Sequence, residues 1–173
     1  MKKSDINPMP EYFDRYINLA ADLELNEALQ ISLAELDNLP SEQWKAIGDK
    51  VYAAGKWTIK DILQHIIDTE RIFSYRALCF ARGETVQLPS YDEASYAQNT
   101  NALGRTLEDL IAELKTVRSS LIALYQSFTP EMLLKTGLGF KGIYSVLSIG
   151  FIMAGHQRWH FKIIEEWYLP LVG

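Results

Sequence analysis

The sequence contains three histidines, His65, His156 and His160, and the last two are four residues apart. Residues at positions i and i+4 of a helix lie one turn apart on one face, so His156 and His160 can bind one ion together. An imidazole from a facing helix, supplied by His65, would complete a set of three protein ligands. Three ligands leave coordination positions open for water or substrate, which is typical of a catalytic rather than a structural metal site.

The helix that carries two of these histidines is apolar around them. At 100° per residue, Ile149 lies about 20° from His156 and His160 lies about 40° from it. Both histidines therefore occupy the centre of an apolar stripe, which is also predicted to include Trp167. On its own helix, His65 lies at the edge of the apolar stripe, and all three imidazoles are expected at or beside the core.

A second interpretation of the same pattern is open at this point. Histidines on apolar helical faces are commonly hydrogen-bonded core residues, and an HxxxH spacing also arises by chance. Three buried imidazoles without an ion would need several polar partners, because each unpaired buried polar group costs about 1–3 kcal/mol. The residue types alone leave both a metal site and a plain helical interaction module open.

Polar residues near the histidines in the sequence have two open interpretations. Asp68, Thr69 and Glu70 follow His65 within a turn and could orient a ligand imidazole, or they could form a solvated helix edge. Gln157 stands where zinc proteases of the HExxH type have their catalytic glutamate. An amide cannot accept a proton as a carboxylate does, so that protease mechanism is not expected here.

Three further residues are interpreted without a chemical role. Trp159 flanks the HxxxH face and is interpreted as a core or interface side chain. Glu165 falls opposite His156 and is expected to face solvent. Cys79, the only cysteine, has no adjacent histidine or basic cluster and is interpreted as an inert, half-buried thiol.

Four long helices are expected to position these residues, and no convincing strand pattern is present. Thr58 and Thr106 are predicted N-caps, while Gly83 and Pro170 are predicted helix ends. A short helix is also expected from Ser41. The long helices are expected at about 11–37, 59–82, 106–128 and 145–169.

The connections predict the topology of an all-α four-helix bundle. The connection from 83 to 105 is too long for a tight turn between antiparallel neighbours, so we expect it to cross the bundle and leave the second and third helices parallel. After a short helical turn at Thr129–Glu131, the segment with Gly137, Gly139 and Gly142 is expected to be a flexible connection.

Composition and charge exclude several classes of protein. The 173 residues are 48% hydrophobic, which is enough for a buried core, and the length predicts one domain covering 1–173. Seventeen basic against 22 acidic residues give a net charge of −5. Nucleic-acid binding depends largely on neutralising phosphates, so an acidic chain without a basic cluster is not expected to bind nucleic acid.

The sequence also predicts a location. One cysteine excludes an internal disulfide and fits a reducing compartment. The first residues carry two lysines without an apolar run behind them, unlike a signal peptide. The most apolar run, 146–154, is about half the length of a membrane span. We therefore expect a cytoplasmic protein without a membrane partner.

Two segments carry a resemblance that covers nearly the whole chain. They are GKWTIKDILQHIIDTERIFSYRALCFARGE, from Gly55 to Glu84, and GFIMAGHQRWHFKIIEEWYL, from Gly150 to Leu169. The sequence resembles the DinB/YfiT-like superfamily, whose members are four-helix bundles with an up-down-down-up arrangement. The resemblance implies a metal triad of one histidine near the start of the second helix and an HxxxH in the fourth, which match His65, His156 and His160.

The resemblance implies a metal site but does not name a substrate. Relatives include thiol transferases that use a low-molecular-weight thiol, as well as isomerases and hydrolases, and they are often homodimers. An ion held by three neutral imidazoles keeps its positive charge and favours deprotonation of a bound water or thiol. We therefore expect a metal-dependent transferase or hydrolase acting on a small molecule, with zinc or nickel, or else iron or manganese. The alternative is a non-catalytic metal-binding or stress-response protein.

Overall fold

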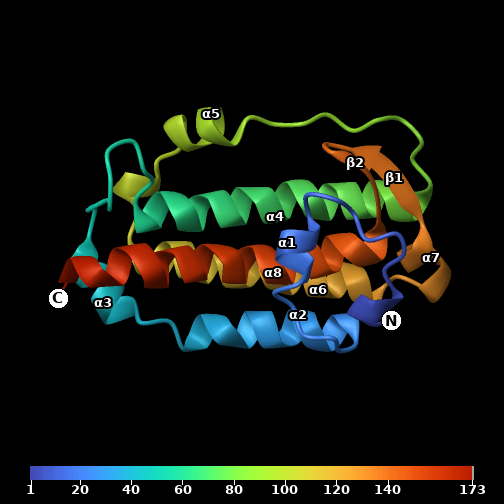
Figure 1. Ribbon diagram of the computed structural model, residues 1–173, viewed down its shortest axis with the longest axis horizontal. Coiled ribbons are helices and arrows are strands. Elements are labelled where there is room, and N and C mark those ends of the chain that lie inside the picture. Colours follow the sequence, from blue (N-terminus) through green and yellow to red (C-terminus); the bar gives the residue numbers. More distant parts are fainter. Residues whose placement is uncertain (173) are drawn as a thin grey trace.

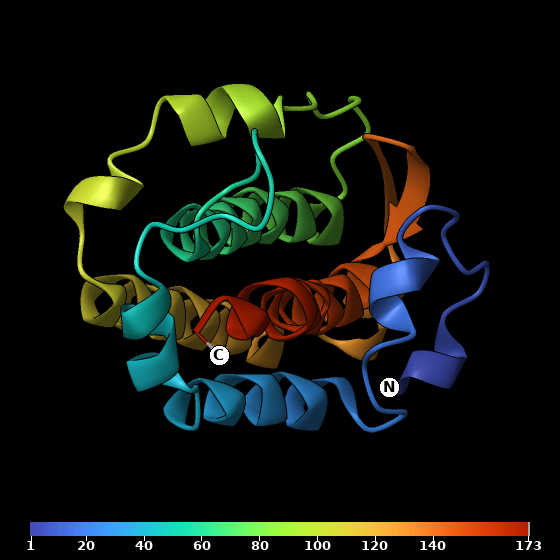
Figure 2. The same cartoon turned by 60° about the vertical axis from the view of Figure 1, so that its left-hand side comes forward.

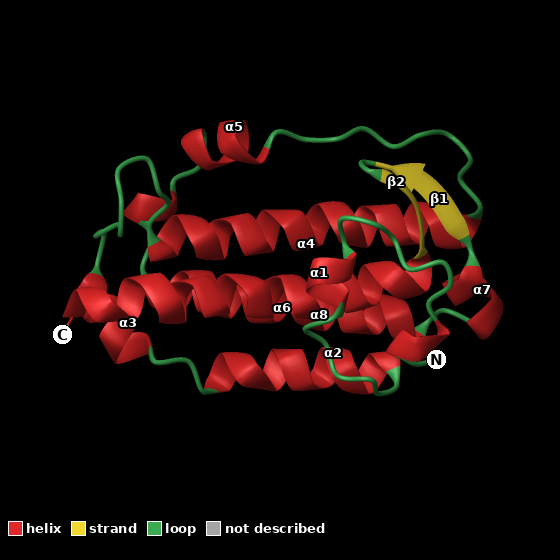
Figure 3. Ribbon diagram, viewed as in Figure 1, coloured by secondary structure: helices red, strands yellow, loops and turns green. Residues whose placement is uncertain are grey.

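The structure, a computed structural model, describes residues 1–172, so Gly173 of the expected domain lies outside the described residues. The described part of the chain is helical with one small hairpin (Figure 3). The helices are α1 (Asp14–Ile17), α2 (Leu25–Ala34), α3 (Ser41–Ile47), α4 (Ile59–Arg82), α5 (Glu93–Gln98), α6 (Leu107–Gln126), α7 (Pro130–Leu134) and α8 (Val146–Ile163). The strands are β1 (Thr136–Gly139) and β2 (Gly142–Ser145).

The long helices α2, α4, α6 and α8 form the bundle. α4 and α6 run in one direction while α2 and α8 run in the other, which confirms the predicted up-down-down-up arrangement (Figure 1). The connection from α4 to α6 travels back along the bundle and carries α5 on its way (Figure 2). α4 packs against both α6 and α8, so the two histidine-bearing helices are neighbours.

The predicted N-caps Thr58 and Thr106 and the predicted helix end at Gly83 agree with the structure. The Thr58 hydroxyl accepts a hydrogen bond from the backbone N–H of Asp61, whose carboxylate accepts one from the N–H of Thr58. Gly83 ends α4 with a φ of 89°, a left-handed conformation that favours glycine. The Thr106 hydroxyl caps α6 by accepting a hydrogen bond from the backbone N–H of Asp109.

The prediction of one helix over 11–37 is wrong, because the chain breaks between α1 and α2. The N-terminal segment takes the backbone groups that a continuous helix would use. The Lys3 amino group donates to the carbonyl of Ala20, and the N–H of Leu25 donates to the carbonyl of Met1. α1 therefore packs against α8 as a separate short helix, and a 3-10 turn at Glu35–Asp37 extends α2.

Two connections are also more ordered than the sequence indicates. The glycine-rich segment forms an antiparallel hairpin in which Gly137 pairs with Tyr144 and Gly139 pairs with Gly142. A Cβ on Gly137 would lie 2.0 Å from the Phe80 ring, so the hairpin backbone rests directly on that side chain. The long connection contains α5 and a 3-10 turn at Ala102–Gly104.

The end of the last helix differs from the prediction. α8 gives way to a π-helical turn at Ile164–Tyr168 and then a 3-10 turn at Leu169–Val172, which includes Pro170. A π turn adds a residue to the turn and rotates everything after it. Trp167 is consequently 54% exposed instead of lying on the apolar stripe. Glu165 faces solvent and Cys79 is half-buried, as predicted.

The core consists of two apolar clusters, one toward each end of the bundle, and buried polar residues lie between them. Arg118 on α6 sits in this polar layer. It donates to both oxygens of Glu70, to the Ser32 hydroxyl and to the carbonyl of Met153, so it contacts all four long helices. Within residues 1–172, the helices lack the combination of length and apolar character that crossing a membrane requires.

Candidate metal centre

The three histidines meet at one point between α4 and α8. The Nε2 atom of His156 lies 3.2 Å from Nε2 of His65 and 3.1 Å from Nε2 of His160. One ligand nitrogen from each ring lies within 4.8 Å of the others. The structure therefore brings together the three residues that the sequence selected, although His65 and His156 are 91 positions apart in the chain.

The distances fit a shared ion better than mutual hydrogen bonding. Nitrogens bound to one ion at about 2.0–2.1 Å lie roughly 3 Å apart, which matches the two spacings around His156. All three rings present Nε2 to the same point. A hydrogen bond between two rings uses one proton between two nitrogens, whereas an ion can bind all three nitrogens at once. The donor set, three imidazoles on two helices, therefore suits a divalent ion with open coordination positions.

Burial keeps these imidazoles neutral. It lowers the pKa of His65 to about 4 and, with the neighbouring His65, the pKa of His160 to about 3. Burial likewise holds the pKa of His156 well below its ordinary value, and the other two histidines and Arg118 add to the effect. The neutral form is the one that binds metal, so at pH 7 protons do not compete for the site.

Neighbouring side chains hold the rings in place. Tyr16 on α1 stands edge-on to the His156 ring at 5.1 Å between centroids, and Trp57 covers the His65 ring at 4.9 Å. The Thr69 hydroxyl lies 3.5 Å from Nδ1 of His65 and 2.6 Å from the hydroxyl of Tyr91. Thr69 and Tyr91 thus form the polar support on the far side of His65.

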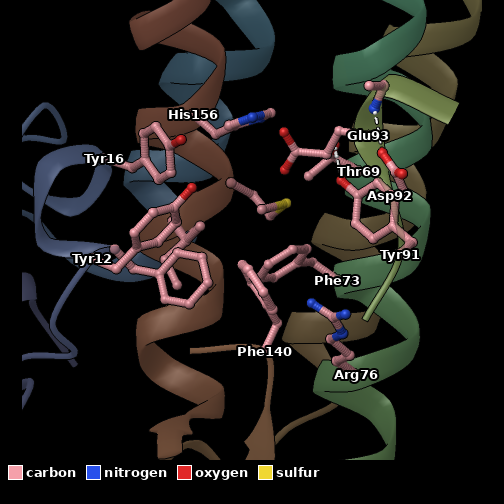
Figure 4. Close-up of a pocket in the computed structure, with 14 residues that line it drawn as sticks. Tyr12, Tyr16, Thr69, Phe73, Arg76, Tyr91, Asp92, Glu93, Phe140 and His156 are labelled. Carbon is pink, nitrogen blue, oxygen red and sulfur yellow. Dashed lines mark hydrogen bonds between the residues drawn. The ribbon is translucent and has the colours of Figure 1, made fainter. Parts of the chain in front are cut away.

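A pocket of about 330 Å³ adjoins the histidine cluster. α1, α4, α8, the long connection and the hairpin all contribute to its wall, with His156 and Tyr16 at one end and Arg76 at the other (Figure 4). A second hollow of about 300 Å³ reaches His160 from the end of the bundle that carries Trp57. The cluster is therefore accessible from two directions.

The other polar residues that the sequence singled out do not face the cluster, apart from Thr69. Asp68 accepts a hydrogen bond from Gln64, and Glu70 is paired with Arg118. Gln157 is buried and donates to the carbonyl of Ser32, which places it in the polar layer of the core.

Trp159 is half-buried and packs against Tyr16 at 5.7 Å between ring centroids, and its interpretation as a core or interface side chain stays a prediction.

Glu93 is a pocket residue that the sequence analysis missed. It is the first residue of α5, and its carboxylate reaches across the pocket toward His156 (Figure 4). Burial raises the pKa of the Glu93 carboxyl above its ordinary value, and the adjacent Asp92 raises it further. The only sequence signal was the helix-start pattern Asp92-Glu93, in a connection without clear periodicity.

The fold and the histidine cluster together define a four-helix-bundle protein with a three-histidine centre. A family model described as the DinB superfamily matches residues 24–164, so this chain belongs to the DinB superfamily. Among solved structures, YfiT from Bacillus subtilis is similar, at 18% identity and a TM-score of 0.69, over 94% of this chain and 89% of that one. YfiT is titled a probable metal-dependent hydrolase with an unusual four-helix bundle topology. No curated protein matches the sequence significantly.

Proposed function

We propose that this protein is a metal-dependent hydrolase of a small molecule and that His65, His156 and His160 hold its divalent ion. The observation that carries the proposal is the convergence of three neutral Nε2 atoms at one end of a pocket. Membership of the DinB superfamily and the likeness to YfiT, a probable metal-dependent hydrolase, support it. Zinc or nickel is expected first, with iron or manganese next.

The chain's own residues would divide the remaining work. When bound, the ion would supply a Lewis acid that lowers the pKa of a water or thiol nucleophile. Glu93 points toward the cluster, and its raised pKa makes its carboxylate a stronger proton acceptor than an ordinary glutamate. Tyr16 and Trp57 cover His156 and His65 and restrict water around the site.

A transferase that uses a low-molecular-weight thiol is the second candidate. Two hollows reach the histidine cluster, one lined by His156 and one by His160. Such a transferase needs room for a thiol and an electrophile at the same centre, and two approaches supply it. A hydrolase needs room for one organic substrate only.

A non-catalytic metal-binding or stress-response role is the alternative to both enzyme classes. The expected homodimer, the cytoplasmic location and the single domain over 1–173 stay predictions. Gel filtration with light scattering tests the dimer directly.

Metal analysis of protein purified without a polyhistidine tag tests the proposal. We expect about one divalent ion per chain in the wild type and loss of most of it in the His160→Ala variant. Screens for ester and amide hydrolysis and for thiol transfer should show activity in the wild type only. Glu165→Ala, an exposed change on the same segment, is the control and should retain both metal and activity.

Each result separates the candidates. Metal loss in His160→Ala together with thiol-dependent activity would favour the transferase. Bound metal without either activity would favour the non-catalytic role. Wild-type activity that persists after complete removal of metal would refute the proposal.

A further inference from the structure

Arg76 is a buried cation at the end of the pocket away from the histidines. Its side chain is 2% exposed and lines the pocket. The guanidinium donates to the carbonyl of Pro89 at 2.9 Å and to the hydroxyl of Tyr144 at 3.5 Å, and it lies over the Phe73 ring at 4.7 Å. Both hydrogen-bond acceptors are neutral oxygens.

Arg118 is a second buried arginine, and it has a structural role in which a carboxylate balances its charge. Arg118 is fully buried, and the two oxygens of Glu70 lie 2.6 and 2.9 Å from its nitrogens. Arg76 has no such counter-ion, because within residues 1–172 no carboxylate oxygen lies within 4 Å of its guanidinium nitrogens. A buried charge without an opposite charge is costly unless a ligand supplies one.

The pocket is divided between a basic and an acidic end. Its two carboxylates, Asp92 and Glu93, come from the start of α5, and Figure 4 shows Glu93 on the side of His156. Asp92 already accepts hydrogen bonds from the first turn of α5. At the opposite end, the buried guanidinium of Arg76 places a positive charge in the pocket wall.

The wall between these ends is largely apolar. Phe73, Phe140, Ile152 and Met153 line it together with Phe13. A ligand that fills the pocket therefore needs an apolar body. Thr69, beside His65, and Arg76 are seven residues apart on α4, which corresponds to about 10 Å along the helix axis.

We propose that Arg76 is the specificity-determining residue of this site and binds a carboxylate of the substrate. The substrate class is then a small carboxylic acid with an apolar body between the carboxylate and the reacting bond. A guanidinium presents parallel N–H donors that match a carboxylate. The orientation of the reacting bond toward the histidines rests on the function proposed above, whereas carboxylate binding by Arg76 does not.

Calorimetry on metal-free protein tests this inference with 4-phenylbutanoate and its neutral amide, 4-phenylbutanamide, as probes. We expect the wild type to bind the acid at least tenfold more tightly than the amide. Arg76→Met should weaken binding of the acid by about tenfold to a hundredfold and leave binding of the amide nearly unchanged. Arg71→Gln, an exposed change on the same helix, should retain the wild-type preference.

The alternative role for Arg76 is structural, through its bond to Pro89 in the long connection. Arg76→Gln keeps an N–H donor for this carbonyl but removes the charge, so it should lose the preference for the acid as Arg76→Met does. Equal weakening of acid and amide in both variants would overturn the proposal. So would a wild type without preference for the acid, including one that binds neither probe. Since no metal is present, failure of the metal-dependent function leaves this result unchanged.

Discussion

The three histidine rings approach one another through their Nε2 atoms, so the protonation of each ring affects the others. Each ring presents Nε2 to the same point, so a positive charge on one ring would lie close to another ring. Protonation of one ring therefore disfavours protonation of the next. The protonation of the histidines therefore affects the stability of the metal-free protein.

We predict that metal-free protein loses stability as the pH falls below about 6.5, the ordinary pKa of histidine. The folded-state pKa is about 4 for His65 and about 3 for His160, so between pH 6.5 and 4 the unfolded chain binds more protons than the folded one. Each histidine then lowers the free energy of unfolding by up to about 1.4 kcal/mol per pH unit. Urea unfolding at pH 7.5, 6.0 and 5.0 measures this dependence. His160→Gln should reduce the slope, and an unchanged slope would contradict the explanation.

Thr69 is predicted to support metal binding through His65. With Nε2 directed to an ion, the proton of His65 lies on Nδ1, which faces the Thr69 hydroxyl. Thr69→Val should weaken metal affinity by about tenfold because the support is lost while the shape is kept. Competition with a chromogenic chelator measures the affinity. Thr69→Ser, which keeps the hydroxyl, should remain close to wild type, and equal losses in both variants would argue against this role.

At the scale of elements, the position of α1 depends on one glycine of α8. A Cβ on Gly155 would lie 1.8 Å from the backbone carbonyl oxygen of Tyr16. The absence of a side chain at this position lets α1 contact α8 beside His156, and this contact places the Tyr16 ring against the histidine. The short helix that the sequence analysis merged into a longer one is thus part of the site wall.

Gly155→Ala should therefore displace α1 and destabilise the fold by about 1–3 kcal/mol, as overpacking does. Gly150→Ala on the same helix is the matched control, because its Cβ would meet the end of the flexible Leu25 side chain at 2.7 Å. We expect a smaller loss there. Chemical denaturation compares the two variants, and an equal or larger loss in Gly150→Ala would show that α1 is not held by this contact.

At the scale of the whole molecule, the polar layer centred on Arg118 joins the four long helices. Ser32, Glu70 and the Met153 carbonyl come from three different helices and all accept hydrogen bonds from this one guanidinium. The layer lies between the two apolar clusters of the core, and its Arg118 is close enough to His156 to lower the pKa of that histidine. The same hydrogen bonds therefore hold the four helices together and fix α8, which carries two of the histidines.

We predict that Arg118→Met lowers the free energy of unfolding by about 3–5 kcal/mol, because it leaves the Glu70 carboxylate buried and unpaired. Replacing both partners, in Arg118→Met with Glu70→Met, should recover much of the loss. Denaturant unfolding of metal-free protein provides both values. A loss below about 1 kcal/mol in the single variant would mean that Glu70 is not held as a charge in the core.

Local signals in the sequence determined the ends of α4, the start of α6 and the placing of two of the three histidines on one helical face. The caps at Thr58 and Gly83 and the i, i+4 spacing of His156 and His160 depend on contacts within one or two helical turns. The length of the 83–105 connection was enough to predict parallel α4 and α6. These features need no knowledge of distant parts of the chain.

Tertiary structure alone decided which distant residues share the pocket. Glu93 points toward His156 because the long connection folds back over α4. Arg76 has no carboxylate partner within residues 1–172 and donates instead to the carbonyl of Pro89. Trp167 became exposed through a π turn that packing at the end of α8 accommodates. Periodicity describes the face of one helix. Which side chains meet across faces depends on packing between elements that are far apart in the chain.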